Sequence, residues 1–292
     1  MAVKNNLVAQ EKQRLSFSGF MMQDAARDQI NKMLGGKDGQ KFITSIVSAV
    51  NATPALQECT NASIFSAAML GASLKLSPSP QLGNYYMVPF NDKEKGKVAQ
   101  FVLGYKGYVQ LAIRSGEYKR LNVLAIKEGE LIRYNPLEED IEVELIDDEE
   151  EREKAPTIGY YAFFELNNGY RKAIYWSRKK MEQHAIKYSA GYKGDRDRGT
   201  KYTFWSKDFD GMAYKTMLRQ LISKWGIMSI EMQSAYDADM AVINEDGTKN
   251  YVEFDEPVIE AEAVEPAAEK KETKTAKKEA APAEDPAAAL FG

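Results

Sequence analysis

The sequence holds few residues of the kinds from which catalytic and metal sites are built. It has one cysteine and one histidine among 292 residues. Cys59 has no partner for an internal disulfide, so we expect a reducing compartment, with Cys59 as a small, partly buried filler rather than a reactive thiol. Zinc sites and Ser-His-Asp or Cys-His catalysis need more of these residues or depend on His184, which we expect at a helix surface or edge.

Long apolar runs are also missing. No window approaches the ~18 apolar residues that a membrane span needs. The first fifteen residues, MAVKNNLVAQEKQRL, lack the continuous apolar stretch of a targeting segment. We therefore expect a soluble, cytoplasmic chain.

A nucleotide phosphate loop is the third absence. No G-x-x-x-x-G-K-[ST] motif occurs. Residues 194–201, GDRDRGTK, have the glycine spacing, but the last two residues are reversed and four charged side chains would crowd a phosphate. ATP-driven chemistry is therefore not expected, and neither are a catalytic residue, a metal site or a cofactor.

Charge is plentiful but segregated along the chain. The net charge of −4 conceals two basic blocks, because residues 92–133 hold nine Lys/Arg against five Asp/Glu and residues 171–224 hold fourteen against five. Between them, residues 138–153 hold one basic and eleven acidic residues, and residues 231–292 hold six and sixteen. This asymmetry indicates a body that binds a polyanion, followed by an acidic tail.

The hydropathy pattern predicts an α+β fold, with a helical N-terminal part, a β-hairpin and a small antiparallel sheet packed with helices. Expected helices cover 38–50, 61–74, 104–115, 177–189 and 210–228, and expected strands cover 85–89, 98–103, 121–126, 141–146, 158–166 and 170–175. The acidic run 147–153 is expected as an exposed turn, and 191–202 as a charged loop. The expected organisation is an arm (1–35), a core (36–230), a linker (231–257) and a disordered acidic tail (258–292) that ends in the apolar residues AAALFG.

Two of the expected helices carry cations beside an apolar stripe. Lys106, Gln110 and Arg114 share one face of helix 104–115. Lys215 and Arg219 lie at one edge of the stripe of helix 210–228, with Lys224 near the other edge. Further charge in adjoining segments comes from Lys119, Arg120, Lys201 and Lys207.

Aromatic residues and glycines accompany these charges. The sequence Gly-Tyr-Lys-Gly occurs twice, at 104–107 and 191–194, where glycines would let backbone N–H groups approach a phosphate. The nearby aromatic residues are Tyr85, Tyr86, Tyr105, Tyr108, Tyr118, Tyr188, Tyr192, Tyr202, Phe204 and Trp205. Basic grooves with aromatic platforms hold single-stranded nucleic acid without reading its sequence. Tyr105 and Tyr108 fall on a helix stripe, however, where a core position is the usual outcome.

The motif order resembles that of the RecT family of phage and prophage single-strand annealing recombinases. The segments that carry the resemblance are KFITSIVSAV, LGASLKLSPSPQLGNYYMVPF, VLGYKGYVQLAIRSGEYKRL and WSKDFDGMAYKTMLRQLISKWGIMS, within roughly residues 40–230. The resemblance implies binding of single-stranded DNA, annealing of complementary strands without ATP in recombination and repair, and assembly into rings or helical filaments in a bacterial host cell. It also implies a partner 5′→3′ exonuclease and, as a further candidate, the host single-strand-binding protein, with Mg²⁺ as a candidate modulator of DNA binding.

The resemblance also selects DNA-contacting residues. Lys106, Arg114, Lys215 and Arg219 become the leading phosphate contacts, and Gln81, Asn84 and Tyr85 lie where the shared motif is densest. The full set of expected DNA-binding residues is Gln81, Asn84, Tyr85, Lys106, Tyr108, Gln110, Arg114, Lys119, Arg120, Lys201, Lys207, Lys215, Arg219 and Lys224.

Two other functions remain open from the sequence. A passive protein that coats single strands would bind without accelerating annealing. A metal-dependent nuclease would use Asp208, Asp210 and part of the acidic run 138–150, although the simpler interpretation is that these two aspartates cap helix 210–228. The acidic tail is interpreted first as a solubilising linker, with partner recruitment or competition with DNA as the alternative.

Overall fold

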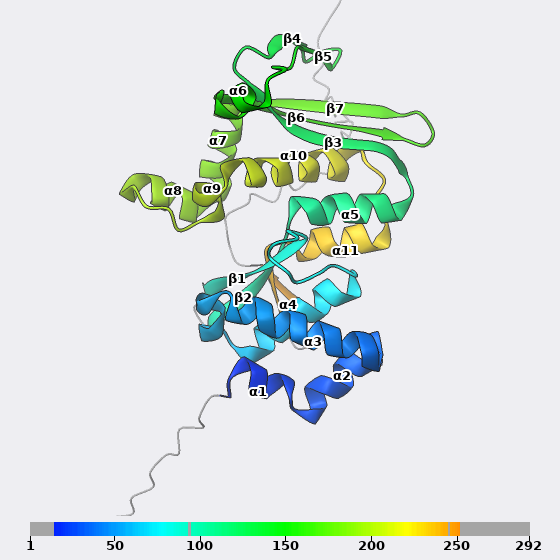
Figure 1. Cartoon of the computed structure of the whole chain (residues 1–292), viewed down its shortest axis with the longest axis vertical. Helices are drawn as coiled ribbons and strands as arrows, with labels where there is room; N and C mark the ends of the chain where they lie inside the picture. Colours follow the sequence, from blue (N-terminus) through cyan, green and yellow to red (C-terminus); the bar gives the residue numbers. More distant parts are fainter. Residues whose placement is uncertain (1–14, 93–94, 245, 252–292) are drawn as a thin grey trace, which may run out of the picture. The chain divides into compact units, whose positions relative to one another are not determined.

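A computed structural model of the chain describes residues 15–92, 95–244 and 246–251, and shows a mixed helical and sheet fold (Figure 1). The described residues form helices packed with a four-stranded and a three-stranded antiparallel sheet, and a separate two-stranded hairpin; the mixed class agrees with the sequence prediction. Among these residues, no helix is long and apolar enough to cross a membrane. The expected disordered tail, 258–292, lies outside the described residues.

The N-terminal part is a group of helices. Its elements are α1 (Phe17–Met21), α2 (Asp24–Leu34), α3 (Gly36–Asn51), the 3₁₀ turn η1 (Pro54–Glu58) and α4 (Asn61–Ser73). Thr60 accepts a hydrogen bond from the Ser63 N–H and so caps α4. The predicted arm 1–35 thus contains two helices, because Met21 and Ile30 supply fully buried side chains to the core. Cys59 is buried, as expected for a filler.

The first sheet packs against these helices. Strands β1 (Tyr85–Asp92) and β2 (Gly96–Leu103) form the predicted hairpin, with Tyr85 opposite Leu103. The strand order is β1-β2-β8-β9, where β8 is Ala241–Ile243 and β9 is Lys249–Tyr251.

The interval 231–257 is therefore no linker over its described part. Helix α11 (Ile230–Ala238) buries Met232, Ala235 and Ala238, and β8 is buried along its whole length. Short side chains at helical spacing, followed by three apolar residues, are the local reason that this segment joins the core.

The second sheet has the order β3-β6-β7, formed by Tyr118–Lys127, Thr157–Leu166 and Arg171–Ser177. The predicted Asn-Asn-Gly turn joins β6 to β7, with Gly169 at φ 86°. The strands β4 (Leu131–Asn135) and β5 (Asp140–Val143) form a separate hairpin. Of these two strands, the sequence predicted only the second, as 141–146.

The acidic run forms helix α6 (Glu149–Lys154) rather than a turn. Asp148 caps it by accepting a hydrogen bond from the Glu151 N–H at 2.9 Å. Three glutamates occupy its first turn, whereas Arg152 and Lys154 occupy its last turn. This order of charges suits the helix dipole and explains why so acidic a segment is helical.

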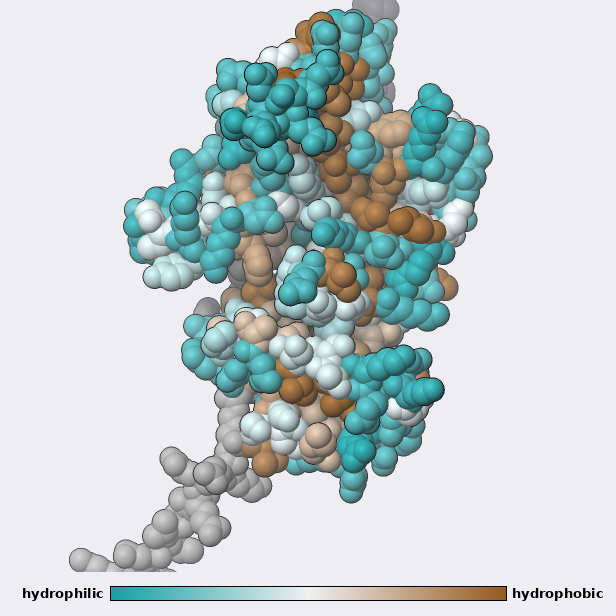
Figure 2. Space-filling model, in the orientation of Figure 1, coloured by the Kyte–Doolittle hydropathy of each residue, from teal (hydrophilic) through white to brown (hydrophobic). Residues whose placement is uncertain are grey.

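The remaining helices are α5 (Tyr105–Ser115), α7 (Arg178–Tyr188), α8 (Ala190–Arg198), α9 (Phe204–Lys207) and α10 (Phe209–Trp225). The expected loop 191–202 is thus largely α8, whose region at the left of Figure 2 shows hydrophilic and near-neutral residues. Buried Asp195 organises the turn after α8, because its carboxylate accepts hydrogen bonds from Thr200, Thr203 and Ser206.

Helix α10 lies between two hydrophobic cores. Leu218 and Ile222 belong to the core of the N-terminal helices and first sheet, whereas Met217 and Leu221 belong to the core beneath the second sheet. The second core also contains Tyr160 and Phe164 of β6. Helix α10 therefore contributes side chains to both cores and links the two halves of the fold.

Candidate nucleic-acid interface

The two cations of α10 that the sequence ranked highest are held by a buried carboxylate. Asp239, which is fully buried, accepts hydrogen bonds from Lys215 Nζ and from Arg219 Nη1, each at 2.8 Å. The same carboxylate accepts the backbone N–H of Leu103 at 2.9 Å. The Lys215 side chain is only 7% exposed. Lys215 and Arg219 thus tie α10 to α11 and β2, which corrects their assignment as primary phosphate contacts.

Two tyrosines expected to contact DNA lie inside the protein. Tyr85 is fully buried, stacks on Phe101 with ring centroids 5.0 Å apart, and fills the space that a side chain at Gly71 would take. Tyr108 is 3% exposed. Burial raises the pKa of both hydroxyls. Neither ring has a face open to a base, so both residues belong to the core rather than to a binding site.

The glycines of the first Gly-Tyr-Lys-Gly element serve packing. The Gly104 N–H donates to the Asn84 carbonyl at 2.9 Å, and a Cβ at Gly104 or Gly107 would overlap the carbonyl of Gly83 or Asn84. Asn84 is therefore occupied through its backbone, whereas Gln81 beside it is exposed. The second copy of the motif lies within α8 and makes no comparable loop.

Exposed cations remain around the start of α5. Lys106 is exposed, and its stem lies beside Gly83. Tyr86 from β1 contacts Phe204 of α9, with ring centroids 5.5 Å apart. Lys207 follows one turn after Phe204 and is exposed.

Two further expected residues, Gln110 on α5 and Lys201 before α9, are exposed. The neighbouring aromatic residue Tyr202 is 77% exposed. We call the group formed by Lys106, Tyr86, Phe204 and Lys207 the α5–α9 surface.

Arg114 acts on a neighbouring helix. Its guanidinium donates from Nη2 to the Leu74 carbonyl at 2.7 Å and from Nη1 to the Lys75 carbonyl at 3.5 Å. Cations that bond the last carbonyls of a helix also interact favourably with its dipole. Arg114 therefore secures the end of α4, although it is exposed at the surface.

Lys119 and Arg120 belong to a cluster around Glu165. This carboxylate is 3% exposed and lies 2.7 Å from Lys119 Nζ, 3.3 Å from Arg171 Nη2 and 3.9 Å from Arg120 Nε. The hydrogen bond from Lys119, with Coulomb attraction from Arg171, holds the pKa of Glu165 below its usual range. Three exposed cations share one carboxylate, so this edge of the second sheet keeps net positive charge.

A denser basic and aromatic group lies on α7, β7 and α10. Lys180 Nζ lies 4.4 Å from the centroid of the Trp176 ring, and Lys187 Nζ lies 5.0 Å from that of Tyr188. His184 contacts both rings, with centroid distances of 5.4 Å and 4.5 Å.

At the end of α10, Lys224 Nζ lies 5.8 Å from the centroid of Trp225, a ring that is 37% exposed. We call Trp176, Lys180, His184, Lys187, Tyr188, Lys224 and Trp225 the α7–α10 patch.

Electrostatics show that the cations of this patch repel one another. Burial and then the charge of Lys224 lower the pKa of Lys180. Burial lowers the pKa of His184 to about 4, helped by the charges of Lys187, Arg219, Lys180 and Lys224. Across residues 15–92, 95–244 and 246–251, no carboxylate forms an ion pair with Lys180, Lys187 or Lys224. Within the described residues, these three lysines are therefore not neutralised by an ion pair and lie beside aromatic rings, whereas Lys172, 4.3 Å from the centroid of Trp225, is paired with Glu139.

Of this patch, only Lys224 was among the expected DNA-binding residues. Lys180, His184, Lys187 and Tyr188 recur at helical spacing, which was a readable signal for one cationic, aromatic face of α7. Trp176 precedes the helix on β7, so only the fold brings it to this face.

The two aspartates considered for a nuclease have structural partners. Asp208 caps α10 by accepting a hydrogen bond from the Gly211 N–H at 2.9 Å, as the sequence favoured. Asp210 accepts a hydrogen bond from the Tyr160 hydroxyl at 2.5 Å and lies 3.5 Å from Arg178. Within the part of the chain that the structure describes, no three His, Cys, Asp or Glu side chains come together as a metal site.

Comparison with known proteins identifies the family. The RecT family model matches residues 40–253. The uncharacterised protein YqaK of Bacillus subtilis is 39% identical over 259 residues, covering 87% of this chain and 82% of its own. Protein RecT of Escherichia coli is 30% identical over 224 residues, covering 75% of this chain and 78% of its own. The chain belongs to the RecT family, and is thus a DNA-binding recombination protein of the strand-annealing kind.

Proposed function

We propose that this protein binds single-stranded DNA on the α7–α10 patch and anneals it to a complementary strand without ATP and without covalent chemistry. The observation that carries the proposal is a group of three lysines, beside the rings of Trp176, Tyr188 and Trp225, that form no ion pair with a carboxylate of the described residues. Lysines that neutralise phosphates release condensed counterions, which favours binding. Stacking on exposed aromatic rings contributes roughly 1–3 kcal/mol per base.

The proposed mechanism is electrostatic and geometric. Lys180, Lys187 and Lys224 bind the phosphates of the DNA backbone. The bases that are not stacked on the protein therefore keep their pairing edges free. Pairing with a second strand then supplies the driving force, at roughly 1.4 kcal/mol per stacked step. The α5–α9 surface and the cations around Glu165 offer further contacts to DNA phosphates on the same protein chain.

Assembly and partners complete the proposal. A ring or helical filament of identical chains would continue the basic surface from one copy to the next, so that a strand is covered cooperatively. A 5′→3′ exonuclease that exposes single strands is the expected partner, with the host single-strand-binding protein as a second one. Mg²⁺ is proposed only as a modulator, through screening of the phosphates.

The proposal is tested by measuring the annealing rate of two complementary oligonucleotides in the absence of ATP, with fluorescence quenching as the signal of duplex formation. We expect acceleration by the protein at low salt and a slower rate for the double variant Lys180→Ala/Lys224→Ala. The slope of log affinity against log salt for single strands should flatten by about 0.7 for each phosphate that the variant no longer neutralises. The matched control is Lys154→Ala on α6, whose lysine pairs only with Glu150 at the exposed surface. If the double variant and Lys154→Ala change the annealing rate and the salt slope equally, the assignment of the α7–α10 patch as the DNA-binding surface is refuted.

The same experiment separates annealing from passive coating, the second function that a basic and aromatic patch supports. A coating protein would bind the oligonucleotides with the same dependence on Lys180 and Lys224, and would leave the annealing rate at or below that of free strands.

A further inference from the structure

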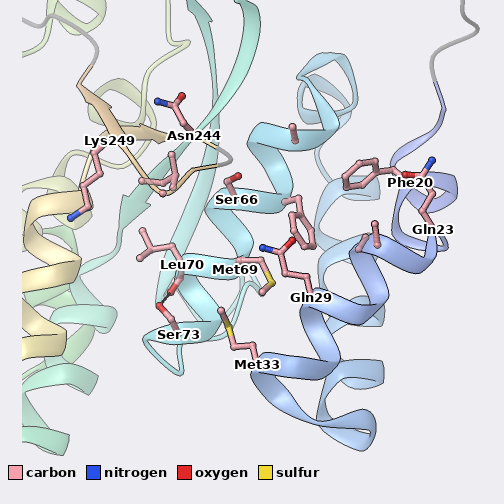
Figure 3. Close-up of a pocket in the computed structure, with 16 residues that line it drawn as sticks. Phe20, Gln23, Gln29, Met33, Ser66, Met69, Leu70, Ser73, Asn244 and Lys249 are labelled. Atoms are coloured by element: carbon pink, nitrogen blue, oxygen red, sulfur yellow. Dashed lines mark hydrogen bonds between the residues drawn. The ribbon is translucent and has the colours of Figure 1, made fainter.

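An open groove between α2 and α4 lacks the cations that a DNA strand needs. It has a volume of about 530 Å³, and Met33 and Met69 point into it from the two helices, with Gln29 between them (Figure 3). Among the described residues that line it, Lys249 is the only cation. A phosphate backbone is bound by several lysines or arginines, so this lining suits apolar groups rather than a strand.

Lys172 of β7, in contrast, is a cation at the edge of the α7–α10 patch. Its Nζ lies 4.3 Å from the centroid of the Trp225 ring, and Lys224 Nζ approaches the same ring at 5.8 Å. The tryptophan is 37% exposed. Two lysines therefore adjoin one partly open ring, which is the combination of charge and stacking surface that binds a nucleotide of a single strand.

A carboxylate occupies Lys172 in the free protein. Glu139, in the turn between β4 and β5, accepts a hydrogen bond from Lys172 Nζ. The lysine side chain is 13% exposed and that of the glutamate is 38% exposed, so the pair is open to solvent mainly at the glutamate. Carboxylate and phosphate oxygens both accept hydrogen bonds from an ammonium group. Glu139 therefore stands where a phosphate would bind Lys172.

The hairpin that carries Glu139 has little core of its own. It lies above β7 in Figure 1, at the opposite end of the fold from α1. Among the described residues, β4 and β5 pair with each other and with no strand of the two larger sheets. Ile132 on β4 is 57% exposed and Leu137 in the turn is 90% exposed. Since a two-stranded hairpin is marginally stable by itself, the turn can shift without disturbing either core.

Contacts with β7 hold the hairpin in place. Tyr134 lies against Tyr175, with ring centroids 5.0 Å apart, and Glu139 pairs with Lys172. The backbone of Glu139 is left-handed, with φ at 58°. Residues other than glycine rarely adopt this conformation, and it persists where surrounding contacts hold it. The ion pair is therefore one of the contacts that fix the turn, and its loss releases the turn while the two tyrosines still anchor the strands.

We propose that Lys172 and Trp225 form a further contact for single-stranded DNA, and that Glu139 competes with the DNA for this lysine. A backbone phosphate displaces the carboxylate from Lys172, and a base stacks on the ring. Because partly exposed ion pairs add little stability, the exchange of one anion for another is easily reversed. Glu139 thus weakens binding and speeds release of the strand. The inference rests on the proposed function of the α7–α10 patch.

Binding of a fluorescein-labelled oligothymidylate to the full chain, measured by anisotropy over a range of salt concentrations, tests the inference. Glu139→Gln removes the competing charge at nearly unchanged shape and should raise the affinity about threefold, within the range for loss of a partly exposed ion pair. Glu138→Gln removes the same charge from the neighbouring residue, whose carboxylate accepts a hydrogen bond from Asn135 at 3.0 Å, and should have little effect. Equal gains from the two variants would overturn the proposal.

Lys172→Gln separates competition for the lysine from a general loosening of the hairpin. This change should lower the affinity and flatten the slope of log affinity against log salt by about 0.7, the value for one lost phosphate contact. In the Lys172→Gln background, Glu139→Gln should give no gain beyond that of Glu138→Gln, because the carboxylate has no lysine to occupy. A larger gain in this background, or a slope that Lys172→Gln leaves unchanged, contradicts the proposal.

The double variant Lys180→Ala/Lys224→Ala shows which of the two proposals has failed. If it weakens binding while Glu139→Gln and Glu138→Gln behave alike, the patch binds DNA and the role of Glu139 is wrong. If the double variant binds as tightly as the unchanged chain, the patch is not the DNA-binding surface, and both proposals are overturned.

Discussion

His184 is the sole histidine, so its imidazole resonances can be assigned without overlap and their pKa reports the charge on the α7–α10 patch. Burial lowers its pKa to about 4, with help from Lys187, Arg219, Lys180 and Lys224. We expect a titration of the imidazole resonances by NMR to show this depressed pKa in the free protein. Lys224→Gln should raise it, because one repelling charge is removed. Single-stranded DNA should raise it also, because phosphates at the lysines favour the imidazolium.

The same pKa predicts a loss of stability in acid. The folded pKa lies below the unfolded value of about 6.5, so the folded state binds fewer protons than the unfolded chain. The contribution is therefore present above pH 6.5 and is lost as the pH falls towards 4. Between pH 7 and pH 5 the loss in the free energy of unfolding is about 2 kcal/mol, worked from the two pKa values at 1.36 kcal/mol per unit.

Comparison with His184→Phe isolates this loss. Phenylalanine keeps a ring against Trp176 and Tyr188 but cannot take up a proton, and the carboxylates titrate alike in both proteins. Urea unfolding at the two pH values should show a loss that is smaller by about 2 kcal/mol in the variant. An imidazole pKa at or above 6.5 in the free protein, or identical losses in the two proteins, would refute the description of His184 as largely buried beside the cations of the patch.

Two more predictions concern the framework behind the patch. Asp239→Ala leaves Lys215 buried without its carboxylate and should cost about 3–5 kcal/mol in the free energy of unfolding, measured in urea. Gly107→Ala forces a Cβ against the Asn84 carbonyl and should lower stability by about 1–3 kcal/mol. Gly36→Ala, where a Cβ meets open space at ordinary backbone angles, should change stability by less than about 1 kcal/mol in the same assay.

Local patterns predicted most of the elements. Helix α5, the hairpin of β1 and β2, and the Asn-Asn-Gly turn depend on neighbours in the sequence, and all three are confirmed. The buried face of α5 differs from the expected stripe, because Leu111 is buried and Ile113 is 63% exposed. Helix α11 and strand β8 were missed because their apolar patterns are short; packing of α11 and pairing of β8 with β2 bury them.

The candidate site was less predictable, because exposure depends on distant partners. Nothing local separates Lys215 from Lys224 on α10, yet the first is buried against Asp239 and the second is exposed beside Trp225. The contact between the Trp176 ring and His184 of α7 likewise depends on the angle between β7 and the helix that follows it.

The buried cluster of Asp239, Lys215 and Arg219 indicates a structural role for part of the family motif on α10. Lys215 and Arg219 stand in the segment that carries the RecT resemblance, but their charges are directed at Asp239. That carboxylate also accepts the N–H of Leu103, so it links α10, α11 and β2 at one point. Because α10 also carries Lys224, disruption of the cluster would displace a lysine of the proposed DNA-binding patch without removing it. If the α7–α10 patch is the DNA-binding surface, as proposed, residues of such a motif are required for binding through the position of the helix, and lysines on α7 and at the end of α10 contact the phosphates.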